Sequence, residues 1–404
     1  MIRADWTLKV GGTLPGYEEK KMPLDGDDRV YFFDYDVTLD QYEDLLRAFR
    51  DGDPDGNGKN DTIPYGANNN VWRSFHVLAG AFGVLWGPTT GSGVETANRI
   101  VNGELVTMHV DPGTKQLIEM LARWYATGLL DSEFASQDIN KGWEKIAAGL
   151  VASTAEVVTY AGNPALNTRP PSGFVKDEEL GRPGAEVVVL PPFIGPNGDQ
   201  GAKSYRPFVP SGGYKFIINR KVEDDKAAKI LQIIDYGRAT EEGFIYFMFG
   251  KPDVHFAWEG EAWNSKPLAK DASQIPAGEM AQGSWSVYPP FYTPEFLKYV
   301  YAEDLGKFAK AFLSAPRGQS LSYRTHTFDI LNETKLPDIL RNSGDTLNTL
   351  FNEFFFKAIT GEIDVNTQWD AYVKEWKANG GQDLLDELAK APLVSGLRQG
   401  KIIY

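Results

Sequence analysis

Residues 53–61 read Asp53-Pro54-Asp55-Gly56-Asn57-Gly58-Lys59-Asn60-Asp61. Oxygen-bearing side chains stand at loop positions 1, 3, 5 and 9, a glycine stands at position 6, and Lys59 at position 7 can offer its carbonyl. A hard divalent cation takes about six to eight oxygen ligands, and alternate residues of a tight loop turn inward to supply them. The spacing predicts an EF-hand-like calcium loop with Asp53, Asp55, Asn57, Asp61 and the Lys59 carbonyl as ligands.

The loop departs from a complete EF-hand at its end. Position 12 is Pro64 in place of the bidentate glutamate, and Thr62 directly follows Asp61. Water or a remote side chain would have to complete the coordination. A register that begins at Asp51 would put Lys59 at position 9, so the register from Asp53 is preferred. The alternative interpretation is a solvated turn after a helix.

Helical segments precede this loop and recur along the chain. Thr38 with Gln41 has capping-box spacing, and Asp111 before Pro112 is an N-cap signal. Four segments repeat apolar residues at i, i+3, i+4 and i+7, which predicts one buried face each. These faces are Tyr42, Leu45, Leu46 and Phe49, with Gly52 as terminator; Leu117, Met120, Leu121 and Trp124, with Gly128 as terminator; Ala227, Ile230, Leu231 and Ile234, ending near Gly237; and Trp369, Tyr372, Val373 and Trp376.

Two short apolar runs are typical of buried strands. One spans residues 186–190 before Pro191-Pro192, and the other spans residues 214–218 after two glycines. Residues 161–184 are crowded with Pro, Gly, Asn and charge, which predicts a long surface loop. Helices that alternate with short strands indicate an α/β architecture.

Composition excludes several classes of protein. The 404 residues carry a net charge of −14, which disfavours binding of nucleic acid through a general basic surface. The absence of Cys excludes disulfides and thiolate sites. No apolar run approaches the roughly 20 residues that span a bilayer. The first residues, Met1 to Trp6, lack the basic and apolar regions of an export signal, so the chain as it stands predicts none.

Searches for catalytic motifs find none. The four histidines, His76, His109, His255 and His326, have no zinc spacing and are better interpreted as structural. Residues 52–59 lack the spacing of a phosphate loop, and residues 91–93 lack both the dinucleotide and the nucleophile-elbow patterns. A glycosidase-type pair of carboxylates stays open, because such pairs are defined by their separation in space.

Aromatic residues outside the helical faces favour an amphipathic ligand such as a sugar. Aromatic rings stack on the C–H faces of sugars, although any one Trp can equally fill a core. Neighbouring Arg73, Asn163, Lys215 and Glu259 could bind hydroxyls or carboxylates. The aromatic residues concerned are Trp72, Trp86, Tyr160, Tyr214, Trp258 and Trp285.

The loop and the residues after it resemble a known family. The calcium loop followed by Trp72, Phe75, Phe82 and Gly83 is similar to extracellular solute-binding proteins of carbohydrate ABC transporters. Within that family it resembles the Gram-positive lipoproteins that are similar to calcium-containing binders of alginate and glycosaminoglycan oligosaccharides. The resemblance covers nearly the whole chain, and it implies the ligands of the calcium loop given above. It also implies sugar contacts at Trp72, at Tyr160 and in the segment from His255 to Trp258.

The resemblance implies a periplasmic-binding-protein-like fold (type II) with two α/β lobes. Residues 1–210, with the calcium loop 53–61, would form the first part of the C-lobe, residues 211–310 the remaining part of the N-lobe, and residues 311–404 a return to the C-lobe. Relatives begin with a further segment, so we expect that the first part of the N-lobe, the signal peptide and the lipidated cysteine are missing here. The full-length form would be an extracellular, membrane-anchored lipoprotein.

Three functions are compared. The favoured one is an oligosaccharide-binding subunit, without enzymatic activity, that closes on sugar and delivers it to a membrane permease. The sugar could be acidic, since Arg73 and Lys215 could receive a uronic acid, and the protein is expected to be a monomer. The alternatives are a glycoside hydrolase or polysaccharide lyase acting on similar sugars, and an interaction module that calcium rigidifies.

Overall fold

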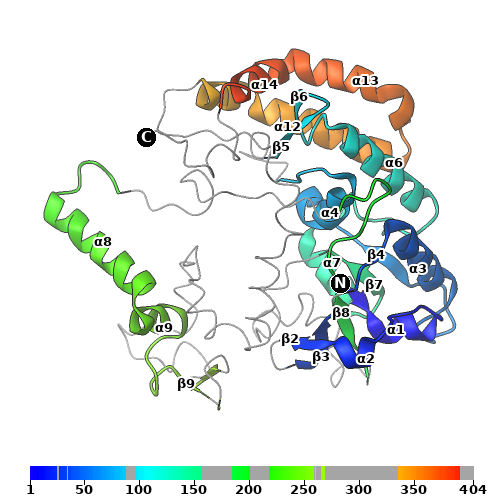
Figure 1. The fold of residues 1–404 in the computed structure, drawn as a ribbon, viewed down its shortest axis with the longest axis horizontal. Coiled ribbons are helices and arrows are strands. Elements are labelled where there is room, and N and C mark those ends of the chain that lie inside the picture. Colours follow the sequence, from blue (N-terminus) through cyan, green and yellow to red (C-terminus); the bar gives the residue numbers. More distant parts are fainter. Residues whose placement is uncertain are drawn as a thin grey trace. The chain divides into compact units, whose positions relative to one another are not determined.

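The computed structural model describes residues 1–24, 27–33, 35–87, 97–155, 184–200, 218–258, 260, 265–268 and 335–391. The chain divides into two compact units (Figure 1). Unit 1 comprises Met1–Ser211 and Phe312–Tyr404, and unit 2 comprises Gly212–Ala311. The fold is mixed α/β, as the alternation of helices and strands predicts. That unit 1 is the C-lobe and unit 2 a part of the N-lobe stays a prediction.

Unit 1 is built on a six-stranded sheet with the order β2-β3-β8-β1-β7-β4. Strand β3 pairs with β8 in parallel, and β4 pairs with β7 in parallel. Strand β1 lies between β7 and β8 and is antiparallel to both, so β3, β8, β7 and β4 all run in one direction. The strands are β1 (Ile2–Arg3), β2 (Met22–Leu24), β3 (Asp27–Phe32), β4 (Ile63–Gly66), β7 (Val151–Thr154) and β8 (Val187–Val189).

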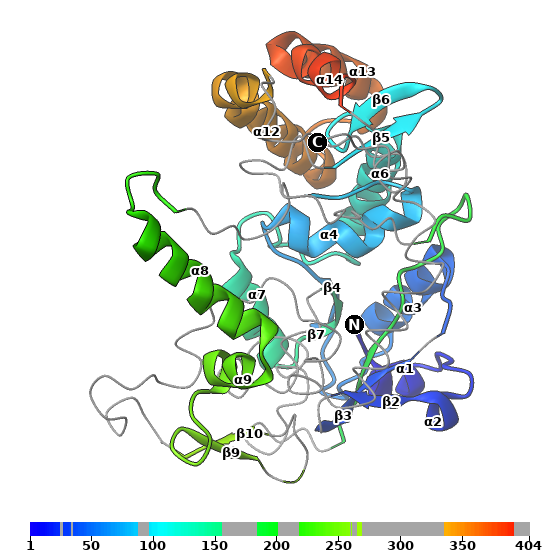
Figure 2. The ribbon, with the colours of Figure 1, turned by 60° about the vertical axis from the view of Figure 1, so that its left-hand side comes forward.

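Helices cover both faces of this sheet. Helices α1 (Ala4–Lys9) and α3 (Leu39–Asp51) lie on one side of β4 and β7, and α7 (Ile139–Ala147) lies on the other (Figures 1 and 2). A short helix, α2 (Tyr17–Lys20), precedes β2. The sheet is therefore buried on both faces, and its strands Val151–Thr154 and Val187–Val189 are accordingly buried throughout.

The helix α3 begins and ends where the sequence predicts. The Thr38 side chain accepts a hydrogen bond from the Gln41 backbone, and the Gln41 side chain accepts one from the Thr38 backbone, which completes the capping box. Tyr42, Leu46 and Phe49 are buried, whereas Leu45 is half-buried. The helix ends at Asp51, directly before Gly52.

A second group of elements in unit 1, mostly helices, includes α6 (Pro112–Ala126). The Asp111 carboxylate accepts from the Gly113 backbone at 2.8 Å, so the predicted N-cap is confirmed. Arg99 holds the same carboxylate at 2.6 and 2.8 Å. The other elements of this group are α4 (Val71–Ala79), η1 (Gly80–Phe82), β5 (Asn98–Val101), β6 (Glu104–Thr107), α12 (Leu336–Thr360), α13 (Val365–Trp376), η7 (Lys377–Gly381) and α14 (Gln382–Leu388).

The aromatic face predicted near the carboxyl end is confirmed in α13. Trp369, Tyr372 and Trp376 are buried, and the Tyr372 ring stacks on Phe354 of α12 at 4.2 Å. The Tyr372 hydroxyl donates to the His109 carbonyl at 2.9 Å. These contacts tie the end of the described chain to the segment that leads into α6.

Unit 2 contains α8 (Asp224–Ala239), α9 (Glu241–Phe249) and the hairpin of β9 (Phe256–Trp258) and β10 (Ser265–Pro267). On α8, Ala227, Ile230 and Ile234 are half-buried as expected, but Leu231 is 51% exposed. The helix continues to Ala239, past the predicted end near Gly237. The expected strand at residues 214–218 and the expected loop at residues 161–184 lie outside the described residues, apart from Ile218 and Gly184 at their ends.

The helices of the described ranges include none with the length and apolarity that crossing a bilayer requires.

A carboxylate of α3 ties that helix to α6. Glu43 accepts from Arg123 at 2.6 Å and from the Trp124 indole at 2.7 Å, and Arg47 pairs with it from the same helix. Burial alone would raise the pKa of Glu43, but the hydrogen bonds from Arg123, Trp124 and Arg47 lower that pKa to about 2. Because the folded pKa lies below the unfolded value of 4.5, the stabilisation is present above pH 4.5 and is lost as the pH falls toward 2.

We therefore expect Glu43→Gln to lower the free energy of unfolding at pH 7 by roughly 1–2 kcal/mol, the range for a partly screened, charge-assisted network. The difference from the wild type should shrink as the pH falls below 4.5. Urea unfolding at pH 7 and pH 3.5 measures both quantities. Glu119→Gln is the control, since Glu119 pairs with Lys115 of α6 at 3.7 Å on the surface. An equal loss in both variants would contradict the role of Glu43.

Candidate ligand-binding site

The carboxyl ends of four strands of unit 1 lie at one edge of the sheet, because β3, β8, β7 and β4 run in the same direction. Phe33 follows β3, Leu190 follows β8, Ala155 follows β7 and Ala67 follows β4. Ligands of open α/β sheets bind outside the carboxyl ends of the strands. This edge is therefore the candidate site of unit 1.

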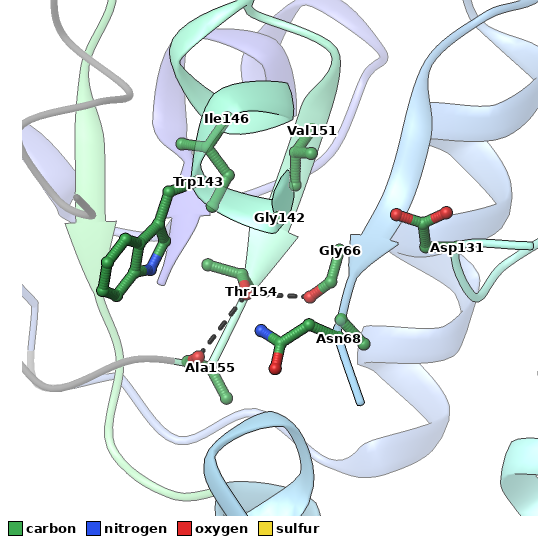
Figure 3. A pocket seen from close by; sticks show the side chains of 10 residues that line it. Gly66, Asn68, Asp131, Gly142, Trp143, Ile146, Val151, Thr154 and Ala155 are labelled. Carbon is green, nitrogen blue, oxygen red and sulfur yellow. Dashed lines mark hydrogen bonds between the residues drawn. The ribbon is translucent and has the colours of Figure 1, made fainter. Parts of the chain in front are cut away.

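A small pocket opens at this edge between β4, β7 and α7 (Figure 3). Its cavity has a volume of about 10 Å³, so it accommodates a group the size of one water molecule or one hydroxyl. Trp143 of α7 is 7% exposed and lies on one side, and Asn68 reaches in from the other side toward Thr154 and Ala155. The lining residues are Gly66, Ala67, Asn68, Asp131, Gly142, Trp143, Ile146, Val151, Thr154 and Ala155.

Asn68 is fixed by its neighbours. Its backbone N–H donates to the Ser74 hydroxyl at 3.0 Å, and that hydroxyl donates back to the Asn68 carbonyl at 3.0 Å. The side-chain oxygen accepts from the Asn70 backbone at 3.0 Å, which sets the orientation of the amide and turns its NH₂ group away from Asn70. Within the part of the chain that the structure describes, this NH₂ group has no hydrogen-bond partner.

A buried polar network holds the segment that carries Asn68. The Gln137 amide donates to the Ala67 carbonyl and to the Asp131 carboxylate, both at 2.6 Å. Lys145 of α7 pairs with Asp131 at 2.9 Å, and Asp131 is 4% exposed. The Gln137 carbonyl also accepts from the Asn69 backbone at 3.0 Å. The turn after β4 is thus linked through Gln137 and Asp131 to Lys145 of α7, which limits its freedom to move.

The predicted residues Trp72 and Arg73 lie on α4, directly after this turn. Asn70 caps the helix by accepting from the Arg73 backbone at 3.2 Å. Trp72 is half-buried, with its ring stacked 6.2 Å from that of His76, and Arg73 is also half-buried. Both side chains are therefore partly exposed on the helix that follows the β4 end of the site.

Trp86 lies outside the helices and strands, as the sequence predicted, but the structure places its side chain in the core and not in a ligand site. The indole is 4% exposed and packs against Phe351 and Phe355 of α12 at 6.1 Å. Its N–H donates to the Val71 carbonyl of α4 at 3.2 Å. The turn that ends at Gly83, which has a φ of 69°, allows the chain to place Trp86 between these two helices.

Two of the predicted residues of unit 2 lie among the described residues, Trp258 at the end of β9 and His255 directly before that strand. His255 is 3% exposed, and its Nδ1 accepts from the Lys251 backbone at 2.8 Å. Trp258 is half-buried and packs edge-on against Phe249 at 5.3 Å and Phe256 at 4.8 Å. Tyr160, Tyr214 and Trp285 lie outside the described residues, as do Asn163, Lys215 and Glu259.

His109 has a structural role, as predicted. It is fully buried against Phe351 and Trp376, and its Nε2 lies 3.2 Å from the side-chain oxygen of Asn348. Burial lowers the pKa of His109 to about 3, so the imidazole stays neutral at physiological pH.

The Asp53–Asp61 loop is organised around Asn57. Its amide NH₂ donates to Asp55 at 2.7 Å and to Asp61 at 3.0 Å, while its backbone N–H lies 3.2 Å from oxygens of Asp53 and Asp55. Partial burial and the neighbouring charges of Asp53 and Asp61 raise the pKa of the Asp55 carboxyl. Asp55 and Asp61 therefore approach the same amide group, and Asp53 accepts from the adjoining backbone.

Binding of a metal ion would require a change in the orientation of the Asn57 side chain. The Asn57 side-chain oxygen accepts from the Lys59 backbone at 2.7 Å, so the amide would have to turn over to act as a ligand. Asp53 has a φ of 43°, which positions its carboxylate to accept from the Gly58 backbone at 3.0 Å. In the described ranges, no three His, Cys, Asp or Glu side chains are already placed to hold one metal ion.

The sequence did not identify Asn68 and Trp143 as site residues. The signal that was available is the run Ala67-Asn68-Asn69-Asn70, which follows directly on the strand Ile63–Gly66. Polar residues at the carboxyl end of a parallel strand indicate a ligand site, but the direction of β4 is known only from its pairing with β7.

Comparison with known proteins assigns the fold. No protein-family model matches the chain. The chain is 24% identical over 406 residues to lipoprotein LipO of Bacillus subtilis, covering 96% of this chain and 68% of that protein.

Solved structures of two sugar-binding proteins illustrate the shared fold. One is the S. pneumoniae ABC-transporter substrate-binding protein FusA in complex with kestose, with a TM-score of 0.58, 18% identity and coverage of 99% of this chain and 72% of FusA. FusA has also been solved as an EF-hand mutant in complex with fructo-nystose. The other is the alginate-binding protein AlgQ2 without calcium ion, with a TM-score of 0.52, 16% identity and coverage of 96% of this chain and 70% of AlgQ2. The chain has the two-lobe α/β fold of the solute-binding proteins of ABC transporters, as the sequence resemblance implied.

Proposed function

We propose that the chain is the oligosaccharide-binding subunit of an ABC importer. The observation that supports this most strongly is the candidate site itself, where a fixed amide and an indole line a pocket at the carboxyl edge of the sheet and the helix that follows carries a partly exposed Trp and Arg. Proteins with the same fold include binders of kestose and alginate, and they are binding proteins rather than enzymes. The subunit would bind sugar without chemistry and deliver it to a membrane permease.

Trp72 and Arg73 are the proposed sugar contacts of unit 1. Trp72 would stack on a sugar face, and Arg73 would favour an acidic sugar. Unit 2, as part of the N-lobe, would contribute His255 and Trp258. Tyr160, Tyr214 and Trp285 stay proposed contacts, whereas Trp86 is left out because it packs in the core. We further propose that the protein acts as a monomer, outside the cell and tethered by lipid, as the name of LipO indicates for that relative.

We propose that the Asp53–Asp61 loop binds calcium. The donor set of Asp53, Asp55, Asp61, the Asn57 amide and the Lys59 carbonyl is the oxygen chemistry that this ion prefers. The convergence of Asp55 and Asp61 on one amide group supports a shared ion, because a cation would relieve the repulsion between them. The ion would have a structural role and would fix the connection between α3 and β4.

The proposed binding function is tested by calorimetry with kestose, nystose and alginate oligosaccharides. We expect heat of binding from at least one of these sugars, and no shortened product after prolonged incubation with it. Release of cleaved sugar would support the hydrolase or lyase instead. The absence of binding to every sugar tested would contradict the proposal.

Trp72→Leu keeps apolar bulk but removes the flat aromatic face. We expect the affinity for the bound sugar to fall about fivefold, because a well-placed aromatic contributes roughly 1 kcal/mol beyond area burial. Val77→Ala is the control, since Val77 is half-buried on the same helix and packs against the same core. Equal sugar affinities of Trp72→Leu and the wild type would disprove the assignment.

Asp55→Ala tests the calcium loop. Calcium at a hundredfold excess over its dissociation constant should stabilise the wild type by about 2.7 kcal/mol, and a chelator should remove this gain. The variant should show a lower Tm in calcium and no response to the chelator. Asp51→Ala should keep the response, because Asp51 belongs to the rejected register. A wild type whose Tm is the same with calcium and with chelator has no such site.

A further inference from the structure

The pocket between β4, β7 and α7 is too small for a sugar ring but large enough for one polar group. Its cavity of about 10 Å³ is close to the space that one water molecule fills. A sugar presents groups of this size as hydroxyls on short bonds. The pocket can therefore hold one hydroxyl of a ligand whose ring lies outside it.

The polar atoms at the pocket match the two needs of a hydroxyl, which accepts and donates. The Asn68 NH₂ group supplies a donor, since Asn68 as a residue is 9% exposed, its amide is oriented by Asn70, and the NH₂ group has no partner among the described residues. The Ala155 carbonyl supplies an acceptor, because the one contact it receives from the described residues is from the Thr154 hydroxyl at 3.5 Å. That hydroxyl is already committed to the Gly66 carbonyl at 2.8 Å.

The donor is also held in place before any ligand arrives. The network of Gln137, Asp131 and Lys145 anchors the carbonyl next to Asn68, and Ser74 fixes the Asn68 backbone. A donor that is already oriented loses little entropy on binding, and a ligand that lacks its acceptor would leave it unpaired. This arrangement discriminates between ligands as well as binding them.

We infer that this pocket is a hydroxyl subsite of the oligosaccharide site, in which the Asn68 NH₂ group donates to one sugar hydroxyl and the Ala155 carbonyl accepts from it. The inference rests on the proposed function, because it needs a saccharide at this edge of the sheet. The subsite selects sugars by the presence of a hydroxyl at one position of the ring. Trp143 forms the apolar wall beside that hydroxyl.

Gly142→Ala tests the subsite without weakening the fold. The added methyl would lie 3.5 Å from the Asn68 side-chain nitrogen and 3.7 Å from its Cβ, which is ordinary contact, and would fill the cavity. Gly142 lies inside α7, where alanine favours the helix. We expect a Tm equal to or above that of the wild type, together with at least tenfold weaker binding of whichever of kestose, nystose and alginate oligosaccharide the wild type binds.

Gly344→Ala is the matched control for this variant. Gly344 lies inside α12, and among the described residues a methyl there would meet only Leu340, at 3.9 Å. Its sugar affinity should equal that of the wild type.

Asn68→Asp is the second test, because it keeps the oxygen that Asn70 needs and removes the donor. A hydroxyl would then face acceptors on both sides and have one proton to share, so we expect about tenfold weaker binding. Asn69→Asp adds the same charge at an exposed neighbour and should bind normally.

Sugar affinities of Gly142→Ala and Asn68→Asp that both equal that of the wild type would overturn the subsite and leave the proposed function standing. A wild type that binds none of the sugars would overturn the proposed function itself.

Discussion

The common direction of β3, β8, β7 and β4 is the constraint on which the rest of unit 1 depends. Strand β1 inserts between β8 and β7 in the opposite direction and joins two parallel pairs into one sheet. Each pair needs helical crossovers, which cover both faces and bury the strands. The same direction gathers four strand ends at one edge, and there the loops are free to carry binding residues.

Local signals predicted the helices well, and among the strands of the sheet they predicted the buried β8 within residues 186–190 but not the others. The Thr38–Gln41 box, the Asp111 cap and the aromatic face of α13 are determined by residues a few positions apart, so the sequence alone revealed them. Strand β1 has two residues, and its partners lie about 150 and 185 positions away. No period can be read from two residues, and pairings over such separations depend on the whole fold.

The same contrast between local signals and long-range contacts applies to the candidate site. The spacing of the Asp53–Asp61 loop pointed to the carboxylates that the structure brings together around Asn57. The aromatic residues gave a weaker signal, because a tryptophan looks the same in sequence whether it binds a ligand or fills a core. Trp86 is such a case, since only Phe351 and Phe355, more than 260 residues later, show that it is internal. The sequence alone does not predict Asn68 as a site residue, because its position at the carboxyl edge of the sheet depends on the direction in which β4 pairs with β7.

In the proposed site, affinity and selectivity would depend on different residues. Partly exposed aromatic rings bury area and tolerate many sugars, because stacking makes few demands on the pattern of hydroxyls. A small pocket with one oriented donor contributes less area but rejects a ligand that leaves the donor unpaired. The buried ion pair between Asp131 and Lys145 fits this division, since Asp131 accepts from the Gln137 amide, and the same amide holds the Ala67 carbonyl in the turn that presents Asn68. Loops at the edge can therefore vary in their aromatic residues while the anchored turn keeps one hydroxyl position under control.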